Sequence, residues 1–105
     1  MTVFDDYSDH YDETVRLTML KAIADDPGGM LNETMLHKVL DDFAFRRSRA
    51  YVRSQMMWLA NAVSAVLVRE INGIMVAKIT PAGKDHLDGR TYLDGIRIPS
   101  TTRGW

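Results

Sequence analysis

Apolar and polar residues alternate along this chain with two different periods. Apolar positions recur at helical spacing over residues 11–25, 33–42 and 48–63. Beyond them, residues 65–71 and 74–80 are rich in β-branched side chains and alternate as strands do. The pattern therefore predicts three helices followed by a two-stranded hairpin.

Local turn and cap signals mark where the helices begin and end. Pro27-Gly28-Gly29 stops the first helix and turns the chain. Asn32 and Ser48 have side chains that accept hydrogen bonds from free helix amides, so each is a suitable N-cap. The short link before Ser48 is typical of a helix-turn-helix.

The hairpin is predicted to carry apolar side chains on both faces. Asn72-Gly73 favours a two-residue type I′ turn, which sets Ile71 opposite Ile74. The face directed to the core would then hold Val66, Val68, Met75, Ala77 and Ile79, with Val68 opposite Ala77. The outer face would hold Leu67, Arg69, Ile71, Ile74, Val76 and Lys78.

A short helix and a turn-rich tail are expected after the hairpin. Thr80 is a suitable N-cap, Pro81 takes the first helical position, and Gly89 ends the helix. We expect one domain with a tail at each end, comprising residues 1–10, 11–89 and 90–105. Tyr92, Ile96 or Trp105 is expected to pin the second tail to the body.

Charge is distributed unevenly although the chain is nearly neutral. Residues 1–45 carry ten acids and three bases, whereas residues 46–105 carry ten bases and four acids, for a net charge of −1. Such asymmetry suits a protein whose basic half docks on nucleic acid. The alternative is that the two halves balance each other within the fold.

Positive charge is most concentrated at the start of the third predicted helix. Arg46, Arg47, Arg49 and Arg53 fall within eight residues. Arginine forks onto phosphates and onto the O6 and N7 atoms of guanine. This segment is therefore the candidate DNA-reading element.

The order of the elements resembles that of a winged-helix domain. Residues 52–68, with Trp58-Leu59 ahead of a β-branched run, resemble the recognition helix and first wing strand of MarR- and ArsR-like regulators. Residues 79–83 resemble the stretch that follows the second wing strand there. More narrowly, residues 11–99 are similar to small winged-helix proteins encoded by Mu-like phages and prophages, with Gly89 and Gly95-Ile96 among the shared features.

The resemblance implies an α+β, mostly α, winged helix-turn-helix that binds double-stranded DNA sequence-specifically, as a phage or prophage transcriptional regulator with its third helix in the major groove. The assigned DNA contacts are Arg46 and Arg47 with Ser48 on phosphates, and Arg49, Tyr51, Arg53 and Ser54 toward base edges. Asn72 and Gly73 would form a wing contact, although this tip lacks the basic residue that a minor-groove contact needs. A homodimer is expected, with Trp58, Ile71 and Ile74 as its candidate interface.

The competing hypothesis is a winged helix that binds a host protein and not DNA. The overall acidity, the bare wing tip and the apolar outer wing face favour that alternative. Both hypotheses place the protein in the cytoplasm, that of the host if it is phage-encoded, because no apolar run approaches a membrane span and the N-terminus is acidic.

Catalytic and metal chemistry find little support in the sequence. There is no cysteine, the three histidines lie in different predicted elements, and the paired aspartates are adjacent in sequence, so they would not face each other on a helix. We therefore expect no enzyme activity, no metal and no cofactor.

Overall fold

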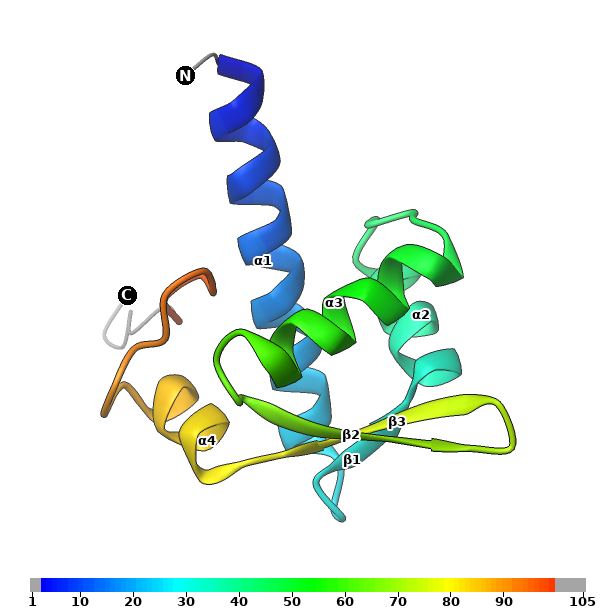
Figure 1. Cartoon of the computed structure of the whole chain (residues 1–105). Coiled ribbons are helices and arrows are strands. Elements are labelled where there is room, and N and C mark those ends of the chain that lie inside the picture. The colour runs from blue at the N-terminus through cyan, green and yellow to red at the C-terminus, as the bar shows by residue number, and fades with distance from the viewer. Residues whose placement is uncertain (1–2, 100–105) are drawn as a thin grey trace.

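The structure, a computed structural model, describes residues 3–99, with side chains from residue 7 onward. This part of the chain forms four helices and a three-stranded antiparallel sheet, an α+β arrangement compatible with a winged-helix-like fold (Figure 1). In chain order the elements are α1 (Val3–Asp25), β1 (Met30–Asn32), α2 (Glu33–Asp42), α3 (Arg49–Asn61), β2 (Val66–Ile71), β3 (Ile74–Ile79) and α4 (Pro81–Asp88).

The first helix is longer than the sequence pattern predicted. α1 begins at Val3, so residues 3–10 are helical, and the expectation of an irregular N-terminal tail is wrong for them. Acidic residues are favourable near the start of a helix, because the helix dipole is positive there. Tyr7 and Tyr11 also lie one turn apart with ring centroids separated by 6.4 Å. These turns project beyond the rest of the molecule (Figure 1).

A short strand that the sequence pattern did not reveal completes the sheet. β1 pairs with β3, with Leu31 opposite Ala77, and the strand order is β1-β3-β2. Three residues are too few for an alternation to be recognised. The strand exists because β3 offers it a ladder of hydrogen bonds, which is a tertiary effect.

The local signals in the sequence are confirmed. The Asn32 side chain accepts from the Met35 amide, and the Ser48 side chain accepts from the Tyr51 amide. The hairpin has the predicted register, with Ile71 opposite Ile74 and Val68 opposite Ala77. The α4 boundaries follow the predicted cap residues, with Thr80 as N-cap and Gly89 in the left-handed conformation.

The core lies between α1, α2, α3 and the inner face of the sheet. Its fully buried members come from all of these elements and include Met19, Leu20, Ile23, Leu36, Leu40, Met56, Leu59, Val66 and Ala77. The sheet lies across one end of the helices, and its other face is directed away from them (Figure 1). The helical layer therefore covers the sheet on one side, which leaves its other side exposed.

The chain after α4 packs against the body as far as it is described. Ile96 is buried in the core, as predicted, and the Arg97 amide donates to the Glu13 carbonyl on α1 at 3.2 Å. His86, fully buried, accepts from the Leu93 amide through Nδ1 and contacts the Arg97 carbonyl through Nε2, which must then be the donor. Tyr92 is 46% exposed, with its ring edge-on to that of His86, and Trp105, the third predicted anchor, lies outside the described residues.

One helical glycine is required by close packing. A Cβ atom at Gly83 would lie 2.4 Å from the Ala65 carbonyl oxygen and 3.0 Å from Ile79. That carbonyl also accepts the Thr80 amide, so it cannot shift without breaking the start of α4.

We predict that Gly83→Ala destabilises the protein by about 1–3 kcal/mol, because overpacking outweighs the gain in helix propensity. For a domain of this size each kcal/mol lowers Tm by about 4–8 °C, which thermal unfolding followed by circular dichroism would measure. Lys84→Ala, at the exposed neighbouring position, is the control and should leave Tm almost unchanged. A higher Tm for Gly83→Ala would show that the packing between Gly83 and the Ala65 carbonyl tolerates a methyl group.

Candidate nucleic-acid interface

A tight turn leads from α2 into α3. Phe43 caps α2, and Ala44 takes a positive φ of 66°, which reverses the chain. The Phe45 amide then donates to the Leu40 carbonyl at 2.8 Å, and His37 Nε2 lies 3.0 Å from the Arg47 carbonyl oxygen. These contacts fix the entry into α3 and present the arginine-rich stretch at its start.

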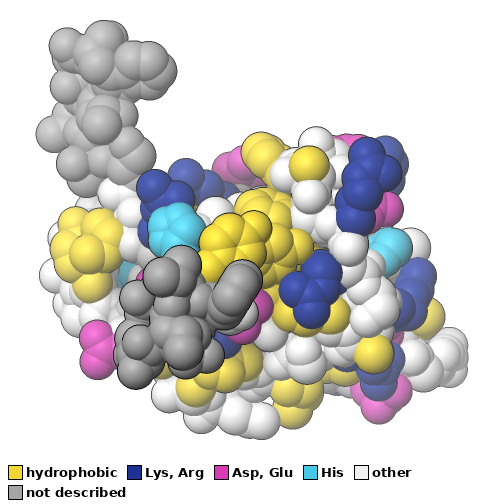
Figure 2. Space-filling view, turned by 90° about the horizontal axis from the view of Figure 1, so that it is seen from above, with side chains coloured by type: hydrophobic (Ala, Val, Ile, Leu, Met, Phe, Trp, Pro, Cys, Tyr) yellow, Lys and Arg dark blue, Asp and Glu magenta, His cyan; other side chains and the backbone are white. Residues whose placement is uncertain are grey.

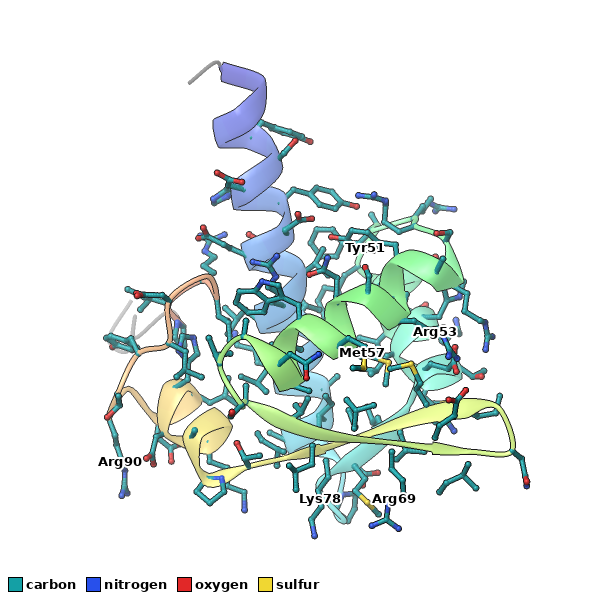
Figure 3. All side chains as sticks on the ribbon, in the orientation of Figure 1. Tyr51, Arg53, Met57, Arg69, Lys78 and Arg90 are labelled. Atoms are coloured by element: carbon teal, nitrogen blue, oxygen red, sulfur yellow. The ribbon has the colours of Figure 1, made fainter. Side chains whose placement is uncertain are left out.

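One face of α3 is open to solvent. Arg49, Ala50, Ser54 and Met57 are exposed on it, at helical spacing, and Arg53 is partly exposed (Figure 3). On this face Ala50 and Ser54 have small side chains, and Met57 has an unbranched one. A helix with such a face can approach another surface closely, because nothing bulky holds it away.

Arg53 is anchored to acidic side chains and does not extend into solvent. Its Nη1 donates to Glu33 Oε1 at 2.6 Å, and its Nη2 donates to Glu70 Oε1 at 3.2 Å. Glu33 is only 1% exposed, and its Oε1 also accepts the Met75 backbone amide at 2.7 Å. Both terminal nitrogens of Arg53 are therefore engaged, which leaves little of the guanidinium for reading a base.

Arg49 and Arg46 are more open. Arg49 Nη1 donates to Thr34 Oγ1 at 3.1 Å and lies 3.7 Å from Glu33 Oε2, but the side chain is 46% exposed. Arg46 is exposed, and none of the described residues forms a hydrogen bond or an ion pair with its side chain. These two arginines have guanidinium nitrogens available to an external partner.

Arg47 and Tyr51 pack on each other and on α1. The Arg47 guanidinium carbon lies 3.8 Å from the centroid of the Tyr51 ring, in a cation–π contact. The Tyr51 hydroxyl donates to Asp12 on α1, and its ring lies edge-on to that of Tyr11. Burial, followed by the Asp12 hydrogen bond, raises the pKa of Tyr51 above its usual value.

Tyr51 was expected to point away from the body, toward base edges, and this orientation is wrong. Its side chain turns toward α1, which runs past the start of α3 and supplies Tyr11 and Asp12. The helical spacing correctly predicted that Tyr51 is not among the fully buried residues of α3. It did not predict the contact with α1, because the sequence pattern did not reveal how far α1 extends. Ser54, by contrast, is exposed as expected, with its hydroxyl donating to the Tyr51 carbonyl at 2.6 Å.

The tip of the hairpin adjoins this face. Asn72 and Gly73 are exposed and have positive φ values of 51° and 81°, as the predicted turn requires. The Gly73 carbonyl accepts from Arg53 Nη1 at 3.4 Å. Arg53 therefore links α3 to the hairpin tip as well as to α2.

Basic side chains do not form one uninterrupted surface here. Figure 2 shows the molecule from above, with dark-blue cationic side chains at several separate places, some of them beside magenta acidic ones. Of the predicted contacts, the structure brings Arg46, Ser48, Arg49 and Ser54 to the open side of the turn and of α3. It commits Arg47, Tyr51 and Arg53 to contacts within the chain.

Comparison with known proteins identifies one relative of similar length. The uncharacterized protein gp26 of Escherichia phage Mu is 33% identical over 87 residues, which are 83% of this chain and 88% of gp26. The chain belongs to the gp26 family. This relation supports the origin in a Mu-like phage that the sequence motifs indicated.

Beyond gp26, the comparisons leave the fold family open. No family model matches the chain, and no solved structure matches it significantly. The resemblance to MarR- and ArsR-like regulators therefore stays a prediction. No helix in the described part of this gp26 relative is long and apolar enough to cross a membrane, and no three metal-binding side chains are grouped there.

Trp58, one of the three predicted interface residues, is covered by the chain itself. The Arg16 guanidinium stacks on its ring at 3.8 Å, and Arg16 also donates to the Gln55 side chain and to the Gly95 carbonyl, each at 2.8 Å. The C-terminal segment thus provides the cover that the outward indole needs. Ile71 and Ile74 remain exposed on the sheet.

Three positions important for the site and its surroundings, Glu33, Arg16 and Gln55, were missed in the sequence. Glu33 was visible only as an acid at a helix start, where it suits the helix dipole without any further partner. The contact between Arg16 and Gln55 was not predictable, because the two residues are 39 positions apart in the sequence. The one available hint was that Gln55 is a polar residue next to the apolar positions of α3.

We predict that Glu33→Ala lowers the free energy of unfolding by about 1–3 kcal/mol, since it leaves the buried Met75 amide without an acceptor. Glu33→Gln should cost less, because the amide oxygen can still accept that hydrogen bond. Glu70→Ala removes the exposed partner of Arg53 and serves as the control, with an expected change below about 1 kcal/mol. Urea unfolding would measure all three, and equal stabilities would contradict the central role of Glu33.

We also predict that Gly95→Ala loosens the C-terminal segment from Trp58. An added Cβ would lie 2.5 Å from the indole, at a residue whose φ is +89°. In a Trp105→Phe background the emission of Trp58 should shift to longer wavelength as water reaches the ring. Gly73→Ala, with a φ of +81° and no atom within 4 Å, is the control for backbone strain alone and should leave the emission unchanged.

Proposed function

We propose that this protein binds double-stranded DNA as a winged helix-turn-helix, with the α2–α3 turn and the first half of α3 on the duplex, and regulates transcription in a Mu-like phage. The observation that supports this most directly is the pair of available arginines, Arg46 and Arg49, beside the small side chains Ala50 and Ser54. Such a face allows a helix to enter the major groove while arginines reach phosphates or guanine.

The contacts within the chain refine the role of each arginine in this proposal. Arg46 and Arg49 are the DNA-contacting residues, and the helix-start amides beside Ser48 suit a phosphate. Arg53 is a positioning residue, because its ion pairs with Glu33 and Glu70 hold α3 against α2 and the hairpin. Arg47 contributes charge from its place on the Tyr51 ring.

The proposed interface is small, so binding should be weak and sensitive to salt. The charges of the two DNA-contacting residues, Arg46 and Arg49, with that of Arg47 beside them, would give a slope of log K against log salt of about −3. Sequence specificity would rest on Arg49, Ala50, Ser54 and Met57, the side chains on the open face of α3.

We predict that wild-type protein binds labelled duplex DNA at low salt and that Arg46→Ala with Arg49→Ala weakens binding about tenfold or more, with the salt slope reduced by about two. Fluorescence anisotropy at several salt concentrations would measure both. Lys84→Ala with Arg90→Ala removes the same charge from exposed positions on and just after α4, away from α3, and is the control (Figure 3).

The same measurement decides against the DNA proposal if wild-type protein fails to bind at low salt, or if both double variants behave alike. The hypothesis of a protein-binding module would then be favoured. Its specific support is the number of arginine contacts that are already satisfied within the chain, at Glu33 above all.

A further inference from the structure

The outer face of the sheet is apolar and uncovered. Leu67 is 65% exposed, and Met30, Ile71 and Ile74 are exposed with it, on three different strands. A shallow hollow of about 540 Å³ lies among Met30, Leu67 and Ile71, with Val76 also in its lining. This face, which we call the outer sheet face, lies opposite the helical layer and is not the surface proposed for DNA.

Two cations stand within this apolar surface. Lys78 is opposite Leu67 and Arg69 is opposite Val76, so Arg69 and Lys78 are diagonal neighbours across β2 and β3. Both point away from α3 (Figure 3). Neither forms an ion pair with any described residue, and no acidic residue has its place on the outer face of these strands. Adjacent like charges among apolar side chains favour a partner that is both apolar and acidic.

The chain carries a segment of that chemistry at its other end. Residues 3–10 contain three acids and no lysine or arginine, together with Phe4 and Tyr7. Tyr7, in this segment, is 66% exposed. The first turns of α1 project from the body at the end of the molecule opposite the sheet (Figure 1). An isolated helical extension of this length is marginal in water, so it gains from packing on another surface.

We propose that the outer sheet face of one copy binds the N-terminal turns of α1 from a second copy. The helix would cover the bare side of the sheet, so that the sheet has helices on both faces. The negative charge of the segment would complement Arg69 and Lys78, and Tyr7 would pack on Leu67 and Ile71. Direct packing of two outer sheet faces is disfavoured, because it would bring four cations together.

The two surfaces lie at opposite ends of the molecule, so the contact is heterologous. Each copy offers one helix and accepts one, which generates a ring if the rotation closes and a filament if it does not. The assembly is tested without DNA, so its outcome is distinguishable from that of the DNA proposal.

Sedimentation velocity over a range of protein concentrations provides the test. Wild-type protein should self-associate, and Arg69→Glu with Lys78→Glu should require at least about tenfold higher concentrations, because like charges would meet. Lys84→Glu with Arg90→Glu makes the same change in net charge off this face and should associate as wild type. Circular dichroism would confirm that each variant is folded.

A complementary variant makes the assignment specific. Asp5→Lys with Asp9→Lys reverses the charge of the helical segment and should also block self-association. Mixing this variant with Arg69→Glu/Lys78→Glu should restore assembly, because each reversed surface then meets an opposite charge. The proposal is overturned if wild-type protein stays monomeric at every concentration, if the sheet variant assembles as wild type does, or if the mixture stays monomeric.

Discussion

A single buried carboxylate holds the centre of this fold. Glu33 is the first residue of α2, yet its side chain reaches the edge of β3 and the flank of α3 at the same time. Removing a charge from water is costly, and it is tolerated here because the oxygens receive an arginine, a backbone amide and a second cation nearby. The sheet, the second helix and the third helix therefore share one electrostatic anchor.

This anchor divides the arginine cluster into two functions. Arg53, toward the middle of α3, holds this helix to α2 and the hairpin, whereas Arg46 and Arg49, toward the turn, keep their charge available. The division accounts for a protein that is slightly acidic overall and still offers cations at one place. It also means that charge counted along a sequence overstates what a surface can present, since each internal ion pair removes a cation from the total.

The sequence predicted those parts of the fold that depend on neighbouring residues. The caps at Asn32, Ser48 and Thr80 and the turn at Asn72-Gly73 act over two to four residues, and their structures follow from side-chain chemistry alone. The strand β1 could not be predicted in this way, because it has three residues and depends on β3 for its hydrogen bonds.

The same distinction applies to the candidate site. The position of the arginines and their helix was evident, but the orientation of each side chain depends on residues far away in the chain. Tyr51 turns inward because its hydroxyl donates to Asp12 on α1. Trp58 is covered because Arg16 stacks on its ring and also binds the Gly95 carbonyl. Periodicity records which side of a helix is apolar, and it holds no information about what lies opposite the polar side.

The place of β1 in the sheet has a consequence for how the chain folds. The β2–β3 hairpin closes over a two-residue turn and can form early, whereas β1 must reach β3 across more than forty residues, with Met30 opposite Lys78. Glu33 follows β1 directly, so the arrival of that strand also delivers the carboxylate to Met75 and Arg53. Sheet completion and burial of the charge are then one step. The folding barrier should therefore depend on a contact between the two halves of the chain.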